Sequence, residues 1–234
     1  MRLIFVRHGE PDYDKDCLTK TGIVQAKSAA KRLKNENITA VYSSPMGRAV
    51  KTAEFTAKKH GLNVKVLDFM HEITWGDKET SDQSEKLKYD GHPWTLAYEL
   101  LTKFPDYVGS KNWKDHHYFK DNKCMDCYET ISNSFDEFLS GFGLIRKNDL
   151  YLCQKPNDDS IALFAHGGSG AIMFSHLLNL PLPFVLTTMP YGVCSVSIIS
   201  FEAQQGQMIV PRLEIFNDMS HIKNFRKEKL HFAQ

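Results

Sequence analysis

Two stretches of the sequence place residues able to do phosphoryl chemistry directly after short apolar runs. Arg7 and His8 follow the apolar residues 3–6, and His166 follows the apolar run 160–165. An imidazole is a good nucleophile toward phosphorus, and a neighbouring guanidinium has the shape and charge to hold phosphoryl oxygens. Each stretch alone is also compatible with an ordinary strand end that carries solvated polar residues. Together they predict a site that binds and attacks an anionic group.

Two further residues extend this prediction. Arg48 falls in the first turn of a helix expected to open at Pro45, where a cation opposes the helix dipole and needs another reason for its position. Glu72 lies in the loop after an expected strand at residues 64–67. Taken singly, they could be a surface arginine and a loop carboxylate. Because such readings for all the residues require several independent coincidences, we interpret them as one catalytic group.

The elements that must position these residues alternate between strands and helices, which predicts an α/β fold with a mostly parallel sheet. In such a sheet the carboxyl ends of the strands lie along one edge and gather residues that are distant in sequence. We expect strands at 3–6, 40–44, 64–67 and 160–165, helices at 19–35, 45–60, 128–147 and 171–180, and a closing strand pair at 196–201 and 208–215.

Residues 73–127 differ from the rest of the chain. They hold all three tryptophans and interleave aromatic residues with Lys, Asp and His, without a clear strand pattern. We interpret this stretch as a cap-like insertion over the sheet, and its aromatics as a small satellite core rather than a substrate stack. The whole chain, 1–234, is expected to form one domain with this insertion.

Composition excludes several classes of partner. The 29 Lys and Arg residues balance 28 Asp and Glu residues, so no global field recruits nucleic acid or an anionic membrane. The most apolar region, 161–186, is interrupted by histidines and prolines and is interpreted as core. Five cysteines argue against a disulfide framework, and no signal peptide pattern is found, so we expect a cytoplasmic protein. The pair Cys124 and Cys127 and the basic tail 223–229 are interpreted as incidental surface features.

At this point the chain resembles the histidine phosphatase superfamily, which has the phosphoglycerate mutase-like fold. The resemblance covers the first and last thirds of the chain, and residues 73–159 only loosely. It implies a three-layer αβα sandwich. The motifs that carry it are Arg7-His8-Gly9-Glu10, Leu18-Thr19-Lys20-Thr21-Gly22 with Gln25-Ala26, Ser43 to Ala49 with Thr52-Ala53, Glu72, Ala165 to Gly168, and the late segment Asn217 to His221.

The resemblance also implies a mechanism. His8 attacks phosphorus and becomes a phosphohistidine, while Arg7, Arg48 and His166 neutralise the phosphoryl oxygens. Glu72 protonates the leaving alkoxide and later helps water to attack the phosphoenzyme. No metal and no other cofactor is implied, because the arginines supply the positive charge.

The substrate-binding residues implied by the resemblance include several that are not catalytic. Asp14 stands where many members carry asparagine in the phosphate pocket, and a carboxylate there would repel phosphate unless it is turned away. The full set is Arg7, His8, Asp14, Thr19, Gly22, Arg48, Glu72, His166 and Gly167.

The extended mutase signature is missing after Glu72, which favours hydrolysis of a phosphomonoester over a phosphoglycerate mutase reaction. Phosphoryl transfer between substrate hydroxyls and a weakly catalytic phosphoprotein-binding module remain alternatives. The expected partner is a small phosphorylated substrate, with no nucleic acid and no membrane. The substrate's identity and the oligomeric state are left open.

Overall fold

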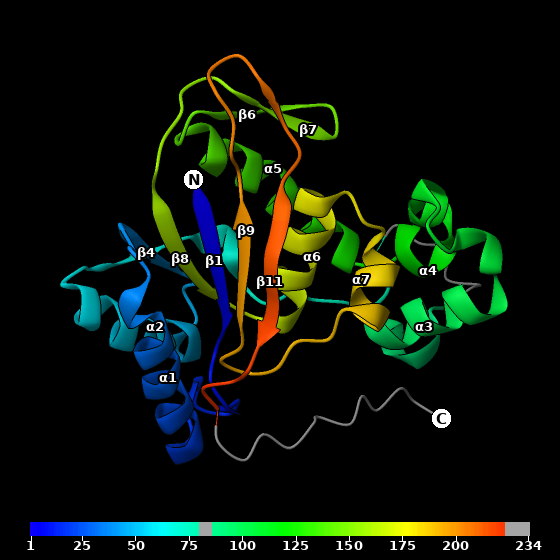
Figure 1. Cartoon of the computed structure of the whole chain (residues 1–234). Helices are drawn as coiled ribbons and strands as arrows, with labels where there is room; N and C mark the ends of the chain where they lie inside the picture. Colours follow the sequence, from blue (N-terminus) through cyan, green and yellow to red (C-terminus); the bar gives the residue numbers. More distant parts are fainter. Residues whose placement is uncertain (80–85, 223–234) are drawn as a thin grey trace.

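The computed structural model describes residues 1–79 and 86–222, so the predicted basic tail 223–229 lies outside the described residues. Its centre is a six-stranded sheet in the order β11-β9-β1-β8-β4-β5 (Figure 1). Strands β1, β8, β4 and β5 are parallel to one another, and β9 is antiparallel to both of its neighbours, β1 and β11, so β11 runs in the same direction as β1. The predicted mostly parallel sheet is therefore confirmed. The bounds are β1 Arg2–Arg7, β4 Ala40–Ser43, β5 Val64–Val66, β8 Ser160–Ala165, β9 Val196–Ser200 and β11 Arg212–Asp218.

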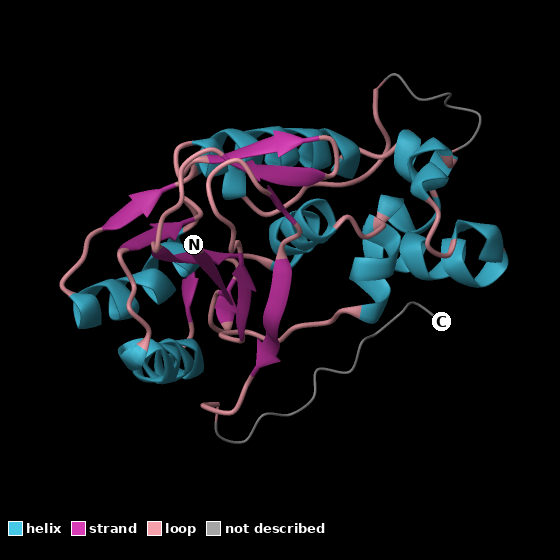
Figure 2. Cartoon of the chain, turned by 45° about the horizontal axis from the view of Figure 1, so that its top comes forward, coloured by secondary structure: helices cyan, strands magenta, loops and turns pink. Residues whose placement is uncertain are grey.

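Helices cover both faces of this sheet (Figures 1 and 2). On β1, Leu3 and Phe5 belong to the apolar cluster that includes residues of α5 (Cys124–Ser140) and α6 (Gly167–Leu178). Ile4 and Val6 point the other way, into the cluster with α1 (Lys20–Arg32) and α2 (Gly47–His60). Successive side chains of a strand alternate between faces, so a strand buried on both sides is apolar throughout. The predicted three-layer αβα sandwich is confirmed.

The described residues between β5 and α5 form short helices and 3-10 turns joined by loops. Helix α3 (Pro93–Lys103) packs against α7 (Leu182–Thr188), and α4 (His117–Lys120) lies with it to one side of the sheet (Figure 1). The 3-10 turns of this stretch are η2 Asp68–Met70, η3 Lys88–Gly91, η4 Pro105–Tyr107 and η5 Lys111–Asp115, and a further one, η1 Leu33–Asn35, follows α1. None of the helices within residues 1–79 and 86–222 combines the length and apolar content that a bilayer span requires.

The aromatic residues of this stretch do not form a separate core. Trp113, Tyr118 and Phe119 are buried in the same apolar cluster as Leu3 and Phe5 of the central strand. Other aromatic residues are exposed on the surface, namely Trp75, Tyr89, Tyr98 and Phe104. The expected satellite core is therefore wrong for the buried members, which extend the main core. That the stretch acts as a cap stays a prediction.

The bounds of two predicted elements, the helix 128–147 and the strand 208–215, differ from those in the structure. Helix α5 stops at Ser140, because Gly143 adopts a positive φ of 80° and leads into β6 (Leu144–Lys147), which pairs with β7 (Leu150–Cys153). The predicted strand 208–215 is interrupted near Pro211, which has no N–H to donate. Its first part, β10 (Met208–Ile209), pairs with β7 instead of β9.

A tight glycine contact fixes the turn that follows β1. This turn contains the short antiparallel strands β2 (Pro11–Asp12) and β3 (Cys17–Leu18). Thr19 caps α1 by accepting a hydrogen bond from the Gly22 N–H at 3.0 Å. A Cβ atom built on Gly22 would lie 2.2 Å from the carbonyl oxygen of Glu10. The start of α1 thus rests directly on the backbone that carries His8.

We predict that Gly22→Ala lowers the free energy of unfolding by about 1–3 kcal/mol, because the added methyl group must displace backbone. Urea unfolding measures this difference. Val24→Ala is the matched control, since Val24 is exposed on the same helix and its loss should change stability by no more than about 0.5 kcal/mol. Equal stability of the two variants would contradict the tight packing described here.

Candidate active site

His8 lies at the carboxyl end of β1, buried and with one ring nitrogen fixed. Its backbone N–H continues the β1–β8 pairing by donating to the Ala165 carbonyl at 2.9 Å. Its Nδ1 atom lies 2.7 Å from the Gly9 carbonyl oxygen, which can only accept, so Nδ1 carries the proton. The lone pair is therefore on Nε2, which lies 3.4 Å from Nε of Arg48.

Arg48, at the start of α2, is only 4% exposed and has an acidic partner. Its Nη1 atom donates to Asp16 at 2.5 Å, and the second oxygen of that carboxylate accepts from the Gly47 N–H at 2.6 Å. The ring of Tyr13 lies 5.4 Å from the guanidinium. Burial by itself raises the pKa of Asp16, but the Gly47 N–H and the Arg48 guanidinium outweigh it and hold that pKa below its usual value.

His166 follows β8 and faces His8, with 5.0 Å between the ring centroids. Its Nε2 atom lies 2.7 Å from the Ser44 hydroxyl, which already accepts a hydrogen bond from the Met46 N–H. Within the described residues, the buried Nδ1 atom of His166 has no hydrogen-bond partner. If the single hydroxyl proton of Ser44 points at Nε2, then Nδ1 bears the ring proton and is free to donate it to a ligand.

Both imidazoles are neutral at pH 7. Burial lowers the pKa of His8 to about 3, opposed by the Gly9 carbonyl and assisted by Arg7 and Arg48. Burial also lowers the pKa of His166 to about 2, with further contributions from His8 and the same two arginines. A neutral imidazole keeps the lone pair that a nucleophile needs.

Glu72 is bound to the N-terminus of α6, the helix that begins after His166. Free N–H groups and the helix dipole favour a negative charge at this position. Burial nevertheless raises the pKa of Glu72 above its usual value, against the effect of the N–H groups and of Arg7. The carboxylate accepts from the backbone N–H groups of Gly168 at 2.8 Å, Ile73 at 3.0 Å, Ser169 at 3.1 Å and Gly167 at 3.1 Å.

Arg7 is held beside the same helix start. Its Nη1 atom donates to the Tyr191 carbonyl at 2.9 Å, and its guanidinium lies 3.7 Å from the position of a Cβ atom built on Gly167. The Tyr191 hydroxyl in turn donates to the Gly167 carbonyl at 2.5 Å. Arg7, His8, Arg48, Glu72 and His166 are thus brought together at the carboxyl edge of the sheet.

The other residues predicted to bind substrate are placed differently. Asp14 is exposed and, within the described chain, forms no hydrogen bond or ion pair with His8 or Arg48; the carboxylate beside Arg48 belongs to Asp16. Thr19 supports the turn after β1, where its hydroxyl donates to a Glu10 carboxylate oxygen at 2.7 Å. Gly22 packs against the same turn, and the Gly167 N–H is taken up by Glu72.

Sequence reasoning missed the roles of Asp16, Ser44 and Tyr191. Asp16 lies in a turn with two other aspartates, and no pattern distinguishes the three. Ser44 belongs to the quoted Ser43 to Ala49 motif, so its place directly before Pro45 was a usable signal. Tyr191 has no such signal, because it reaches the site through a loop after α7.

The late segment Asn217 to His221 is hydrogen-bonded to the loop that follows α7 and contains Tyr191. The Asn217 side chain accepts from the Gly192 N–H at 3.0 Å, and Nε2 of His221 lies 2.9 Å from the Cys194 carbonyl. The Cys194 N–H donates to the backbone carbonyls of Arg7, at 2.9 Å, and of His8, at 3.2 Å. The end of the chain therefore holds the backbone of the two residues near its beginning.

Among residues 1–79 and 86–222, no group of three or more His, Cys, Asp or Glu side chains is arranged to hold a metal ion. The expectation that no metal is needed stays a prediction, to be tested by chelation. The positive charge at the site comes from Arg7 and Arg48.

Comparisons with known proteins agree with the order of the motifs. The model of the histidine phosphatase superfamily, branch 1, matches residues 3–112. A probable phosphoglycerate mutase, GpmB, of Photorhabdus laumondii is 32% identical over 111 residues, which cover 40% of this chain and 52% of that protein. A putative phosphoserine phosphatase of Hydrogenobacter thermophilus is 33% identical over 88 residues, covering 33% and 43%. The chain thus spans about half the length of the curated relatives it matches.

The fold is shared over a longer stretch. The phosphoserine phosphatase of Entamoeba histolytica, solved in complex with 3-phosphoglyceric acid, superposes with a TM-score of 0.59 at 23% identity. The superposition covers 94% of this chain and 98% of that one. The chain is thus similar to the histidine phosphatase superfamily in its motifs over residues 3–112, and to a solved phosphatase of the phosphoglycerate mutase-like kind in its fold.

Proposed function

We propose that the chain is a metal-independent phosphomonoester hydrolase that acts through a phosphohistidine at His8. The observation that carries this proposal is the state of the His8 ring. It is buried and neutral, its Nδ1 proton is held by the Gly9 carbonyl, and its Nε2 lone pair lies between Arg48 and the His166 ring. This is the arrangement that in-line attack on phosphorus requires.

In the first step, Nε2 of His8 attacks phosphorus while the bond from phosphorus to the ester oxygen breaks. The departing alkoxide takes the proton of Glu72, and the phosphoryl group stays on His8. Arg7, Arg48 and the Nδ1–H of His166 donate to the phosphoryl oxygens as their charge spreads. Burial raises the pKa of Glu72, and the dianionic substrate acts in the same direction, so both favour the protonated carboxyl group from which the leaving group takes its proton.

In the second step, water attacks the phosphohistidine. The Glu72 carboxylate takes a proton from the water, the bond between phosphorus and Nε2 breaks, and inorganic phosphate leaves. The same carboxyl group has then returned to its protonated state. Throughout both steps Asp16 keeps the Arg48 guanidinium oriented, because it fixes Nη1 while Nε faces His8.

The substrate class we propose is a small phosphorylated hydroxy or amino acid. The similar proteins include a putative phosphoserine phosphatase and a phosphatase solved with 3-phosphoglyceric acid, which supports this class. The similarity to a probable phosphoglycerate mutase keeps a second candidate, phosphoryl transfer to another substrate hydroxyl. That reaction shares the first step, and only the acceptor in the second step differs. A purely phosphoprotein-binding role has no need of a neutral, oriented His8.

We predict that His8→Ala lowers kcat by at least about 10³-fold while the protein stays folded, because the nucleophile is lost. Rapid acid-free quenching of the wild type with labelled phosphoserine should trap acid-labile phosphate on His8. His60→Ala is the matched control and should keep both activity and label. Label on another residue, or full activity of His8→Ala, would overturn the mechanism.

Loss of activity in EDTA, restored by a divalent cation, would overturn its metal independence.

The second prediction concerns the proton from Glu72. Glu72→Gln keeps the side chain's shape but removes the proton, so formation of the phosphoenzyme should slow by about 10²–10⁴-fold with an alkyl phosphate. It should slow far less with a nitrophenyl phosphate, whose leaving group is stable without protonation. Single-turnover rates with the two substrates measure the difference, and unchanged inhibition by inorganic phosphate confirms an intact pocket. Equal losses on both substrates would exclude Glu72 as the acid.

The third prediction concerns pH. His8 and His166 have pKa values near 3 and 2 in the native state, whereas in the unfolded chain a histidine titrates near about 6.5. Between these values the unfolded state binds protons that the native state does not, so the free energy of unfolding falls as the pH falls below about 6.5. His166→Gln should reduce this slope by about 1 kcal/mol per pH unit. Urea unfolding from pH 6 to pH 5 measures it, and an unchanged slope would contradict a neutral buried ring.

A further inference from the structure

The turn between β2 and β3 contacts Arg48 with two side chains, and the reaction described above uses only one of them. The turn comprises residues 13–16 and is closed by the Asp16 N–H, which donates to the Tyr13 carbonyl at 3.4 Å. Asp16, at its end, binds Nη1 of Arg48. Tyr13, at its start, has its ring centre 5.4 Å from the central carbon of the same guanidinium. The ring is therefore a second contact to a cation that the proposed reaction needs.

Backbone contacts fix the place of this turn. A Cβ atom built on Gly47, at the start of α2, would lie 2.4 Å from the Asp16 carbonyl oxygen, so the turn packs directly on the helix that carries Arg48. The second oxygen of the Asp16 carboxylate accepts from the Gly47 N–H at 2.6 Å. At the base of the turn, Asp12 of β2 pairs with Cys17 of β3. The turn that carries the Tyr13 ring is thus anchored both to α2 and to the β2–β3 pair.

The ring contact does not use the hydrogen-bonding edges of the guanidinium. An aromatic ring attracts a guanidinium through its π-electron face and takes none of the N–H groups. Asp16 occupies Nη1, whereas Nη2 lies 3.3 Å from the sulfur of Met46, a weak acceptor, and Nε faces Nε2 of His8 at 3.4 Å. Within the described residues, the edge formed by Nε and Nη2 therefore has no carboxylate partner, and it can donate to two phosphoryl oxygens.

The three groups differ in their exposure to solvent. Arg48 is 4% exposed, the Asp16 side chain 41% and Tyr13 68%. Water and salt reduce the attraction that an exposed carboxylate exerts on a cation. A cation–π contact is stronger on a desolvated cation than on an exposed one, and the Arg48 guanidinium is nearly removed from solvent. The ring thus contributes to holding Arg48 even though Tyr13 itself is exposed.

We propose that Tyr13 is a positioning residue, whose ring fixes the plane of the Arg48 guanidinium so that its Nε–Nη2 edge meets the phosphoryl group. A hydrogen bond to Asp16 alone would leave this plane free to tilt. With the ring in place, the cost of orienting Arg48 is met on folding and not on substrate binding. The inference rests on the proposed function only in that Arg48 binds phosphate.

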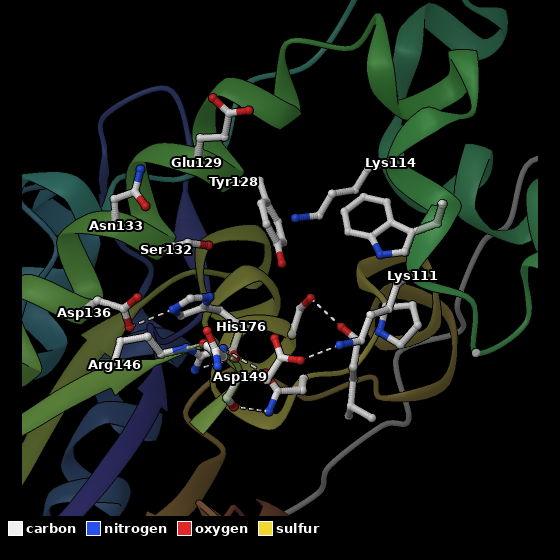
Figure 3. Close-up of a pocket in the computed structure, with 17 residues that line it drawn as sticks. Lys111, Lys114, Tyr128, Glu129, Ser132, Asn133, Asp136, Arg146, Asp149 and His176 are labelled. Carbon is white, nitrogen blue, oxygen red and sulfur yellow. Dashed lines mark hydrogen bonds and ion pairs between the residues drawn. The ribbon is translucent and has the colours of Figure 1, made fainter. Parts of the chain in front are cut away.

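Phosphate binding has to be assigned to this site, because a separate cavity of about 480 Å³ lies beside the last turn of α6 (Figure 3). The Asp149 carboxylate there accepts from Lys111 at 2.5 Å, and Asp136 lies 2.8 Å from Nε2 of His176. A dashed line joins the latter pair in Figure 3. The cavity wall carries as many cations as carboxylates, namely Lys111, Lys114 and Arg146 against Glu129, Asp136 and Asp149. It therefore offers a phosphate no net positive charge.

The test is titration calorimetry with inorganic phosphate, which reports on Arg48 without turnover. Tyr13→Leu keeps an apolar side chain but removes the π face, and it should weaken phosphate binding by about three- to tenfold. Tyr13→Phe keeps the face and should retain binding within twofold of the wild type. Arg48→Met should weaken binding at least tenfold, which assigns the measured binding to this site and not to the cavity of Figure 3.

Phe55→Ala is the matched control, because the Phe55 ring also belongs to a cation–π pair on α2, with Lys51 and Lys27 each at 5.7 Å. It should bind phosphate like the wild type. The inference would be overturned by binding within twofold of the wild type in Tyr13→Leu, by an equal loss in Tyr13→Phe or Phe55→Ala, by unchanged binding in Arg48→Met, or by a wild type that binds no phosphate. A wild type that binds phosphate through the ring but forms no label on His8 would refute the phosphohistidine mechanism alone.

Discussion

The burial of two neutral imidazoles is the constraint on which the site depends. An imidazolium at His8 would lose its hydration and stand next to two arginines, so the ring stays neutral. A neutral ring has one N–H and one nitrogen lone pair. The Nδ1–H of His8 donates to the Gly9 carbonyl, and the lone pair on Nε2 faces Arg48. The buried guanidinium needs a carboxylate, supplied by Asp16, and that carboxylate is completed by a backbone N–H of α2. In this series each buried polar group is fixed in position because it hydrogen-bonds to, or neutralises the charge of, the preceding group.

Most of the fold could be predicted from the sequence, because strands buried on both faces read as short continuous apolar runs. The strand 160–165 was predicted with its bounds, and α2 ends at His60, directly before Gly61, because glycine readily adopts the positive φ that ends a helix. The β6–β7 hairpin was missed, because its residues continue the helical pattern of α5 and only Gly141 and Gly143 mark the break. The buried aromatic residues 113–119 were assigned to a separate core, because pairing with the main core depends on contacts far apart in sequence.

The site was predictable where a residue follows a strand or opens a helix, as Arg7, His8, Arg48 and His166 do. Topology then brings such residues to one edge without further information. The partners that fix them were not predictable. Asp16 reaches Arg48 through the shape of one turn, with a φ of 45°, and two neighbouring aspartates have the same chemistry. Tyr191 contacts Arg7 across 184 positions of sequence, and only the folded loop brings them together.

The position of β1 has a consequence for the order in which the chain can be made. This strand lies between β8 and β9, so its backbone groups have no neighbouring strand until residues 160–200 have left the ribosome. At about 5–20 residues per second, synthesis reaches that point roughly 8–40 s after His8 is made. The carbonyls of Arg7 and His8 accept their hydrogen bonds from the Cys194 N–H, so these bonds form only after Cys194 is made. The contact of His221 with the Cys194 carbonyl forms later still. A nascent chain therefore carries its nucleophile during the whole time in which residues 9–221 are made, and it acquires the full pocket only after them.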